Sequence, residues 1–199
     1  MKILALDSTS ENMVIALSID NKIYSFIGEA ESKKHNSQVL PQIDKLLSEA
    51  QIDIKDVDYF ACVIGPGSFT GIRIGVSSVN ALSFALGKKC VAITSFEELA
   101  YGVDADKFYC AIDCRHDCFY YAKFAESFKN QLESGEMTAA SLKEKNNVVY
   151  KVGASRPEAL IGIAKSKIAA GEFAELAPLY LKKSQAEREY DMKNMDKTV

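Results

Sequence analysis

The stretch GPGSFTGIRIG at residues 65–75 carries four of the chain's eleven glycines and is the first candidate for chemistry. It follows an apolar run and precedes a helical pattern, which is where phosphate-binding loops occur. A Walker loop needs Gly-Lys-Ser/Thr, but here Gly71 is followed by Ile72. The dinucleotide fingerprint needs a glycine where Thr70 stands. Neither standard phosphate loop is therefore present.

The same residues predict close packing. Gly71, Gly75 and Ser78 fall on one face of the helix expected over residues 69–86, and glycines four apart leave a flat strip that another helix can approach. Each glycine inside a helix costs about 1 kcal/mol relative to alanine, so a compensating contact is expected. On this stretch alone, that contact could lie within the chain or between two chains.

The second candidate site is DSTS at residues 7–10. Asp7, Ser8 and Thr9 follow an apolar run, where a carboxylate and hydroxyls can hold a metal-bound nucleotide. An Asx-type turn satisfied by local hydrogen bonds is an equal alternative. CAIDCR at 110–115 echoes LALDST at 4–9, so Asp113 is the counterpart of Asp7 in a partial repeat.

Other catalytic patterns are missing from the sequence. His35 and His116 are the only histidines, and neither has a neighbour at metal-ligand spacing. No Gly-x-Ser-x-Gly elbow occurs. The cysteines fit no zinc pattern and predict buried or half-buried thiols in a reducing compartment, with Cys114 in a turn and away from its two neighbours. The five cysteines are Cys62, Cys90, Cys110, Cys114 and Cys118.

Composition and charge are those of an ordinary folded protein. The chain has 199 residues, of which 48% are hydrophobic and 26% charged, and its net charge is −3. A negative net charge argues against tight nucleic-acid binding by the chain alone. The sequence opens without the apolar segment of a signal peptide, and no apolar run looks long enough to span a bilayer. We therefore expect a cytoplasmic protein that makes no membrane contact.

The elements that must position these residues follow from hydrophobic periodicity. Strands are predicted over residues 2–7, 13–19, 22–28, 59–64 and 88–95, and helices over 37–50, 69–86 and 95–102. Pro41 is compatible with the first of these helices only if it lies in the first turn, where its missing N–H does no harm.

The second half of the sequence repeats this plan in part. We expect a hairpin over 108–124, polar loops over 129–146, a strand over 148–153 and a helix from Pro157 to about residue 170. The order βββ-α-β-α-β-α followed by a shortened repeat predicts an α/β fold of the actin-like ATPase (ASKHA, ribonuclease H-like) type, with two βββαβαβα units of which the second is shortened. We expect subdomains at 1–103 and 104–183 and a charged, frayed tail at 184–199. A fold of this kind does not settle function.

Several segments together resemble one protein family. The chain carries, in order, LALDSTS, KKHNSQVLPQIDKLLSEA, GPGSFTGIRIG, AITSFEELA, AIDCR and APLYLKKSQAE. This order and spacing resembles the TsaB (YeaZ) family of bacterial tRNA threonylcarbamoyladenosine biosynthesis proteins, from residue 2 to about residue 187, with a looser match in the second half. The resemblance implies the actin-like fold and a paralogous relation to TsaD, the catalytic subunit. TsaD-like proteins carry a metal-binding His-x-x-x-His where this chain has Ser95 and Leu99, which cannot replace imidazole ligands.

The family role implied by this resemblance is that of a non-catalytic subunit. Such a protein pairs with a TsaD-like transferase, helps recruit a TsaE-like ATPase, and supports threonylcarbamoyl transfer to the adenosine next to the anticodon. It meets tRNA only through the complex, and it also forms homodimers through much the same surface. No cofactor of its own is implied, apart from weak ATP or ADP binding at the partner interface. Asp7, Ser8, Thr9 and Asp113 would then be a vestigial nucleotide site.

The resemblance also implies where the partner binds, namely on the helix after GPGSFTG and on the helix that follows His35. We expect Gly75→Leu to break pairing while leaving the monomer folded, because the small residues would allow the close approach. The candidate interface residues are His35, Val39, Ile43, Gly67, Ser68, Gly71, Arg73, Gly75, Ser78 and Leu82.

Two enzyme hypotheses stand beside this one. The first is an active ATPase or kinase of the same fold that uses Asp7, Thr9 and Asp113 around a magnesium nucleotide; the absent second phosphate loop and the small second lobe count against it. The second is a metalloprotease, which the missing histidine pair makes a poor candidate.

Overall fold

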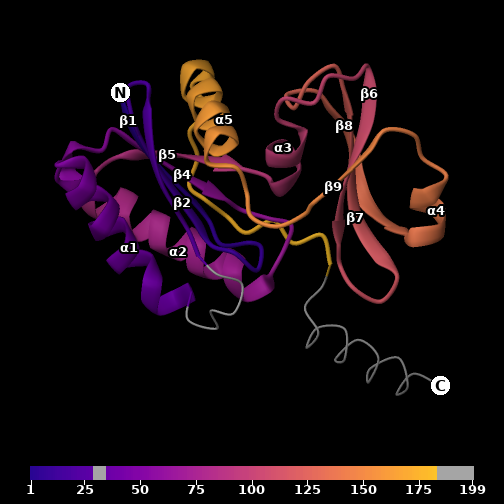
Figure 1. The fold of residues 1–199 in the computed structure, drawn as a ribbon, viewed down its shortest axis with the longest axis horizontal. Helices are drawn as coiled ribbons and strands as arrows, with labels where there is room; N and C mark the ends of the chain where they lie inside the picture. Colours follow the sequence, from indigo (N-terminus) through magenta and orange to yellow (C-terminus); the bar gives the residue numbers. More distant parts are fainter. Residues whose placement is uncertain (29–34, 183–199) are drawn as a thin grey trace.

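A computed structural model describes residues 1–28 and 35–182, and the side chains of all of these except residues 35 and 36. The expected tail at 184–199 lies outside the described residues. Two β-sheets stand side by side, with helices packed on and between them (Figure 1). The first sheet has the order β3-β2-β1-β4-β5. Its strands are β1 (Lys2–Asp7), β2 (Val14–Ile19), β3 (Lys22–Ile27), β4 (Tyr59–Val63) and β5 (Lys89–Ile93).

The inner strands β1, β2 and β4 of the first sheet are buried on both faces, which is why they read as continuous apolar runs, whereas the edge strand β3 is partly exposed. Leu4 and Leu6 point to the face that carries the first two long helices, whereas Ile3 and Ala5 point to the opposite face. β1 pairs antiparallel with β2 and parallel with β4, so its carboxyl end meets the carboxyl end of β4 at one edge of the sheet. The predicted hairpin of β2 and β3 is confirmed, and Asp20 in its turn has φ 53°.

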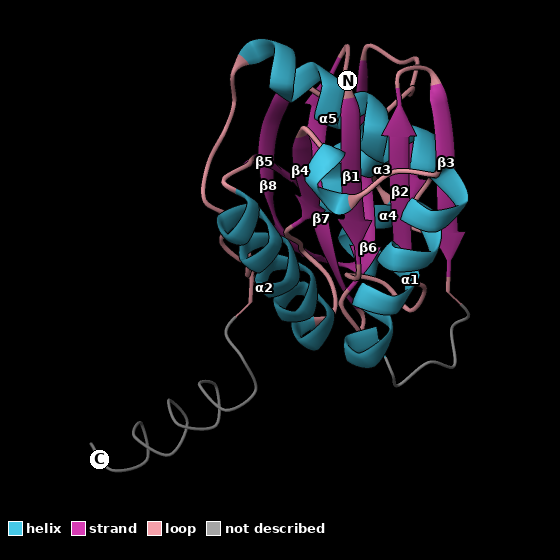
Figure 2. Cartoon of the chain, turned by 90° about the vertical axis from the view of Figure 1, so that its left-hand side faces the viewer, coloured by secondary structure: helices cyan, strands magenta, loops and turns pink. Residues whose placement is uncertain are grey.

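Helices α1 (His35–Ala50) and α2 (Phe69–Leu86) lie side by side over one face of this sheet (Figure 2). A short 3-10 turn, Ile54–Asp56, precedes β4. The prediction that Pro41 lies in the first turn of its helix is wrong, because α1 begins at His35 and Pro41 is in its interior. The helix nevertheless forms, since Pro41 is exposed and the opposite side of α1 packs on the sheet. The residues that it buries there are Val39, Ile43, Leu46 and Leu47.

α2 begins and ends where the sequence predicts. Ser68 caps its start and Gly87, at φ 61°, ends it in the left-handed conformation that glycine tolerates. The expectation that no apolar run could span a bilayer is wrong by length and composition, because α2 is long and apolar enough to do so. Ile72, Val76 and Val79 are buried against the first sheet, so we assign α2 as a core helix.

The second sheet has the order β8-β7-β6-β9. Its strands are β6 (Lys107–Asp113), β7 (Cys118–Ala125), β8 (Gln131–Thr138) and β9 (Val148–Tyr150), and α4 (Ala139–Lys143) follows β8. The prediction of polar loops over 129–146 is therefore wrong. β8 is an edge strand whose side chains are mostly exposed, and so it carries no apolar alternation that would show it as a strand.

The two sheets share one plan. Numbered within each half, both have the strand order 3-2-1-4, and the second sheet lacks the fifth strand. The second half therefore runs βββαβα, and the chain has the predicted actin-like fold with a shortened second unit.

The last helix of each half packs on the sheet of the other half. α3 (Ser95–Ala100) follows β5 but covers β6, β7 and β9 through Phe96 and Leu99. α5 (Pro157–Ala170) follows β9 but covers the first sheet through Leu160 and Ile163, among others. Figure 1 shows both helices between the two sheets. Each half therefore contributes a helix to the hydrophobic core of the other, although the strands before the loop that follows α3 form one sheet and those after it form the other.

Candidate functional site

The glycine loop lies against the end of β1 in the same chain. The Ser68 hydroxyl accepts a hydrogen bond from the Gly71 N–H at 3.2 Å, and the Ser8 hydroxyl donates to the Gly71 carbonyl at 2.7 Å. A Cβ atom at Gly71 would overlap the carbonyl oxygen of Ser8, and one at Gly67 would overlap that of Thr9. The loop therefore needs glycine so that the backbones of α2 and β1 can touch.

Gly75 belongs to the same contact, one turn further along α2. A Cβ atom there would lie 2.6 Å from the Ser8 hydroxyl oxygen and 3.2 Å from the sulfur of Cys62. Gly71 and Gly75 are both buried. The close approach that the glycines allow is thus internal, which answers the question that the sequence leaves open. The prediction that Gly75→Leu would spare the monomer is wrong, because a leucine would have to displace β1 and β4.

Other candidate interface residues are also placed differently from the prediction. Val39 and Ile43 are almost completely buried in the core between α1 and the first sheet, so they cannot face a partner. Leu82 is half-buried against the same core, and Ser78 is half-buried beside it. The side chain of His35 lies outside the described residues. The predicted interface set thus combined residues that face the sheet with Ser68 and Arg73, which are exposed.

The side of α2 that faces away from the sheet is exposed. We call the residues Arg73, Ser77, Ala81 and Phe84 the outer stripe. Phe84 is 90% exposed, which is unusual for a large aromatic side chain. Leu40, on the neighbouring α1, is 55% exposed. The outer surface of the two helices therefore carries apolar groups that nothing within the described chain covers.

An extended strap, residues 172–182, returns from the end of α5 across α2. Within the strap, Leu176 is buried in the core beside α2, and Asn80 exchanges two hydrogen bonds with the Leu176 backbone, at 2.9 and 3.2 Å. The Leu179 N–H donates to the carbonyl of Ile64 at 2.8 Å, and the Leu179 carbonyl lies 2.6 Å from the position that a Cβ at Gly65 would take. The strap thus holds the start of the glycine loop from the side opposite β1.

The end of the strap fixes one cation of the outer stripe. The ring of Tyr180 stacks on Phe69 with centroids 4.7 Å apart, and the Tyr180 hydroxyl accepts a hydrogen bond from Arg73 Nε at 2.9 Å. The guanidinium of Arg73 lies 4.0 Å from the centroid of the Phe69 ring. Arg73 is therefore pre-oriented at the surface by two aromatic rings.

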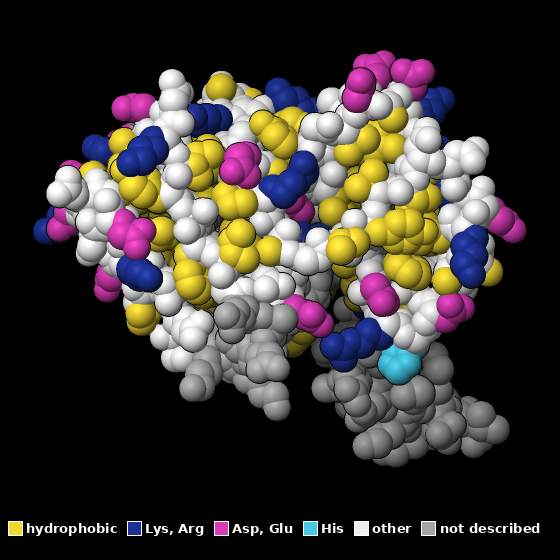
Figure 3. Space-filling model, in the orientation of Figure 1, with side chains coloured by type: hydrophobic (Ala, Val, Ile, Leu, Met, Phe, Trp, Pro, Cys, Tyr) yellow, Lys and Arg dark blue, Asp and Glu magenta, His cyan; other side chains and the backbone are white. Residues whose placement is uncertain are grey.

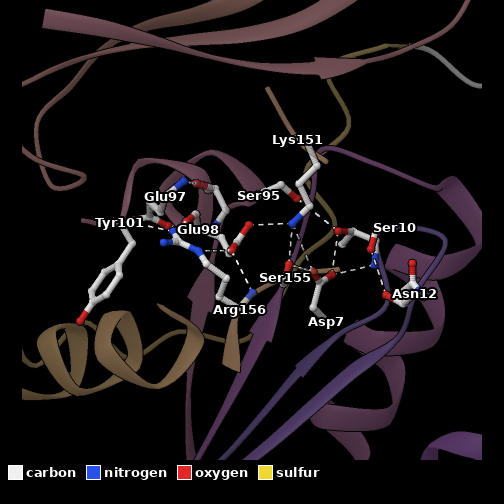
Figure 4. A network of polar contacts seen from close by, with 12 residues as sticks. Asp7, Ser10, Asn12, Ser95, Glu97, Glu98, Tyr101, Lys151, Ser155 and Arg156 are labelled. Carbon is white, nitrogen blue, oxygen red and sulfur yellow. Dashed lines mark hydrogen bonds and ion pairs between the residues drawn. The ribbon is translucent and has the colours of Figure 1, made fainter. Parts of the chain in front are cut away.

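A network of polar side chains joins the two halves. We call it the cleft network, and Figure 4 shows it from close by. Asp7, at the end of β1, is fully buried, and its carboxylate accepts hydrogen bonds from the Thr9 N–H at 2.8 Å and the Thr9 hydroxyl at 2.7 Å. Ser155, just before α5, donates to the other carboxylate oxygen of Asp7. The Thr9 and Ser95 hydroxyls lie 3.3 Å apart.

The other end of the network is centred on Glu98 of α3, which is 2% exposed. Lys151, which follows β9, donates to Glu98 Oε2 at 2.6 Å and to the Ser155 hydroxyl at 2.6 Å. The Lys151 ammonium also lies 4.0 Å from the Asp7 carboxylate. Arg156 donates from its backbone N–H to Glu98 Oε1 at 3.1 Å, and its guanidinium binds the carbonyls of Glu98 and Tyr101. Two buried carboxylates are thus paired with two cations.

The predicted nucleotide residues do not come together. Asp7, Ser8 and Thr9 lie at the end of β1, but each is engaged within the chain. Asp113 is exposed, and its carboxylate accepts a hydrogen bond from the Arg115 N–H in the turn after β6. The geometry therefore favours the turn interpretation of both aspartates over a magnesium-nucleotide site.

Ser95 and Leu99, where the family resemblance leads us to expect histidines in TsaD-like proteins, are both buried. Ser95 is 1% exposed and hydrogen-bonds within the cleft network, whereas Leu99 packs on the second sheet. Among the residues with described side chains, no group of three or more His, Cys, Asp or Glu is arranged to hold a metal ion. A hydroxyl and an aliphatic side chain supply no ligand set for zinc or iron.

The cysteines are free, and three of them, Cys62, Cys90 and Cys110, are buried, as predicted. The prediction that Cys114 lies away from Cys118 is wrong. The Cys114 N–H donates to the Cys118 carbonyl at 3.0 Å across the turn, and burial together with a hydrogen bond to Cys118 raises the pKa of Cys114 to about 12. Because its pKa is raised to about 12, the half-buried Cys114 thiol stays protonated at neutral pH.

The buried thiol of Cys110 makes stability depend on alkaline pH. Burial, and secondly the charge of Glu98, raise the pKa of Cys110 from 9.0 to about 12. Above about pH 9 the unfolded chain loses this proton but the folded chain keeps it, so the unfolding free energy falls by about 1.4 kcal/mol per pH unit up to about pH 12. Between about pH 10 and pH 11, the unfolding free energy measured in urea should fall with pH by this much less per unit in Cys110→Ala than in the wild type. Identical slopes in the two proteins would contradict the assignment.

Reasoning from the sequence missed Glu98, Lys151, Ser155 and Arg156. Glu98 follows Glu97 in SFEEL, and Glu97 completes the capping box of α3 with Thr94, so both acids look like solvent-exposed first-turn residues. Lys151 follows a strand of only three residues. The Tyr180 contact was also missed, although APLYL is an apolar run just before a charged segment and gave a signal for a packed strap.

Comparisons with known proteins agree on one relationship. The family model of TsaD, tRNA N6-adenosine threonylcarbamoyltransferase, matches residues 14–139. The tRNA threonylcarbamoyladenosine biosynthesis protein TsaB of Escherichia coli is 29% identical over 147 residues, which cover 72% of this chain and 63% of that protein. TsaB of Buchnera aphidicola from Schizaphis graminum is 38% identical over 98 residues, 49% of this chain and 46% of that protein. The match thus spans about half to two thirds of the length of these relatives.

A solved structure supports the same relationship over nearly the whole chain. YeaZ from Pseudomonas aeruginosa superposes with a TM-score of 0.75 at 26% identity, and the match covers 90% of this chain and 99% of that one. The similarity in structure therefore includes the second half, where the similarity in sequence is weaker.

Proposed function

The chain belongs to the TsaB/YeaZ family, within the group of proteins that the TsaD model describes, and from this premise we propose that it is a non-catalytic subunit in the synthesis of threonylcarbamoyladenosine in tRNA. It pairs with a TsaD-like transferase, which carries out threonylcarbamoyl transfer to N6 of the adenosine next to the anticodon. The observation that carries the non-catalytic role is the cleft network, in which Asp7, Ser95 and Glu98 are engaged with groups of the same chain.

The proposed surface for this pairing is the outer stripe of α2 together with the exposed part of α1. Partner interfaces are rich in aromatic side chains and arginine, and a few such residues supply most of the binding free energy. Phe84 and Leu40 offer exposed apolar area, and Arg73 is held in one orientation by Phe69 and Tyr180. The small side chains of Ser77 and Ala81 lie between Arg73 and Phe84 on α2 and leave room for a partner helix. A homodimer would use the same surface.

The remaining partners follow from the family and from charge. We infer that a TsaE-like ATPase joins the complex and that any ATP or ADP binds weakly, at the partner interface. We also infer that the tRNA is modified in the cytoplasm. On the face seen in Figure 3, Lys and Arg are scattered among Asp and Glu and form no continuous basic area. With a net charge of −3, the chain alone offers few phosphate contacts, so tRNA is expected to bind through the complex.

Depletion of this protein from its native host should remove threonylcarbamoyladenosine from tRNA, because the transferase would lack its subunit. Nucleoside analysis of hydrolysed tRNA measures the modification directly. Re-expression of the wild-type chain should restore it, and the purified chain alone, incubated with tRNA, ATP and a threonylcarbamoyl donor, should produce none. Unchanged modification after depletion would overturn the proposed role.

A further inference from the structure

The cleft network contains a feature that subunit pairing does not require. Two buried carboxylates, Asp7 and Glu98, come from the first half of the chain and face one cleft between the sheets. Buried carboxylates remain charged only when cations or strong hydrogen-bond donors surround them. In this cleft the central cation comes from the second half of the chain, as Lys151.

The Lys151 ammonium is surrounded by oxygen atoms. It lies 2.6 Å from Glu98 Oε2, 2.6 Å from the Ser155 hydroxyl and 4.0 Å from Asp7 Oδ2. Ser155 also donates to that same oxygen of Asp7, so its hydroxyl connects the ammonium to the second carboxylate by two hydrogen bonds. Only 10% of the lysine side chain is exposed.

Carboxylates and hydroxyls are the ligands that hard divalent cations bind. We propose that Lys151 is the resident cation of the cleft: its ammonium takes the place of a divalent ion between Asp7 and Glu98, joins the two halves, and closes the cleft to metal–nucleotide complexes. The geometry supports this, because each carboxylate directs one oxygen toward the ammonium, Glu98 by direct contact and Asp7 through the Ser155 hydroxyl, and uses its other oxygen to accept hydrogen bonds from Arg156 or Thr9. Arg156 binds the other oxygen of Glu98, so that two cations balance the charges of the two buried carboxylates.

Lys151→Ala tests the proposal by leaving two carboxylates and no central cation. The melting temperature of the variant should fall by about 10 °C, since breaking a buried ion pair leaves unpaired buried charge. Millimolar Ca²⁺, whose coordination is flexible, should then raise its melting temperature saturably, and isothermal titration should give one site per chain. The wild-type protein should show neither response.

Lys167→Ala is the matched control. Lys167 of α5 forms an ion pair of 2.7 Å with Glu97 of α3 and is similarly buried. The second carboxylate beside it, that of Glu172 at 3.9 Å, is 59% exposed and so is hydrated, whereas Asp7 beside Lys151 is fully buried. Lys167→Ala should therefore lose stability without gaining a response to Ca²⁺. Equal responses in this control, in wild type and in Lys151→Ala would show nonspecific binding, and an unchanged melting temperature in Lys151→Ala would show that its ammonium does not hold the cleft; either result overturns the proposal.

The double variant Glu98→Gln/Lys151→Ala keeps the test decisive if the single variant does not fold. It replaces one of the two buried carboxylates that Lys151 neutralises, so it should be recovered folded and melt above the single variant. It should also bind Ca²⁺ at least tenfold more weakly. A double variant that is no more stable than Lys151→Ala would show that charge is not what Lys151 supplies, and the proposal would fail.

Discussion

Gly71→Ala should unfold much of the protein at temperatures where the wild type is fully folded. The added methyl group would overlap the carbonyl oxygen of Ser8, which is backbone and cannot rotate away. Moving it would also break the hydrogen bond of 2.7 Å from the Ser8 hydroxyl to the Gly71 carbonyl. Overpacking of this kind costs about 1–3 kcal/mol and occasionally more. We expect an overpacking cost near 3 kcal/mol, which exceeds the gain of about 1 kcal/mol in helix propensity; the net loss of about 2 kcal/mol should lower the melting temperature by about 4–8 °C.

Gly135→Ala is the matched control for this change. The new Cβ atom would lie 3.4 Å from the Tyr121 ring, an ordinary contact, and the residue is in the edge strand β8. Its melting temperature should stay close to that of the wild type. Thermal unfolding followed by circular dichroism compares the three proteins. If Gly71→Ala and Gly135→Ala have the same melting temperature, the end of β1 can move aside easily, and the close contact with Ser8 is not what requires glycine at position 71.

Unlike Gly71→Ala, Phe84→Ala should leave the stability of the folded chain unchanged and weaken its pairing with the TsaD-like partner. Phe84 is 90% exposed, so its removal costs the folded monomer little, within about 0.5 kcal/mol. An aromatic anchor at an interface contributes about 2 kcal/mol or more, which corresponds to about a thirtyfold rise in Kd. Isothermal titration against the purified partner measures this change.

Val152→Ala provides the comparison for the pairing experiment. Val152 is 83% exposed but lies after β9 in the second half of the chain, away from α2. Its removal should change neither the affinity nor the melting temperature. Equal affinities for wild type and Phe84→Ala would place the partner on another surface and would leave the outer stripe unexplained.

The fold could be predicted from the sequence wherever apolar periodicity carried the signal. α2 was predicted with its observed bounds, and Leu4 and Leu6 already showed β1 as a buried strand. β8 was missed because its exposed residues do not alternate. Pro41 was expected only in a first turn, but it lies inside α1, where packing on the sheet outweighs its local cost.

The candidate site could be predicted less well, because it depends on residues far apart in the chain. The sequence indicated that Gly71 and Gly75 make a close contact but could not name the other side, which is Ser8, more than sixty residues earlier. Glu98 and Lys151 meet across a separation of 53 residues and belong to different halves of the chain. No local pattern marks such a pair, because burial of a charged residue follows from tertiary packing.

The exchange of helices between the halves has a consequence for synthesis on the ribosome. The face of the first sheet formed by Ile3, Ala5 and Val91 is covered by α5, which spans residues 157–170. While the first half emerges, this apolar face has no helix to cover it, and it stays open through the synthesis of the whole second sheet. The nascent chain therefore needs protection, by the ribosome surface or by a chaperone, until its last helix has been made.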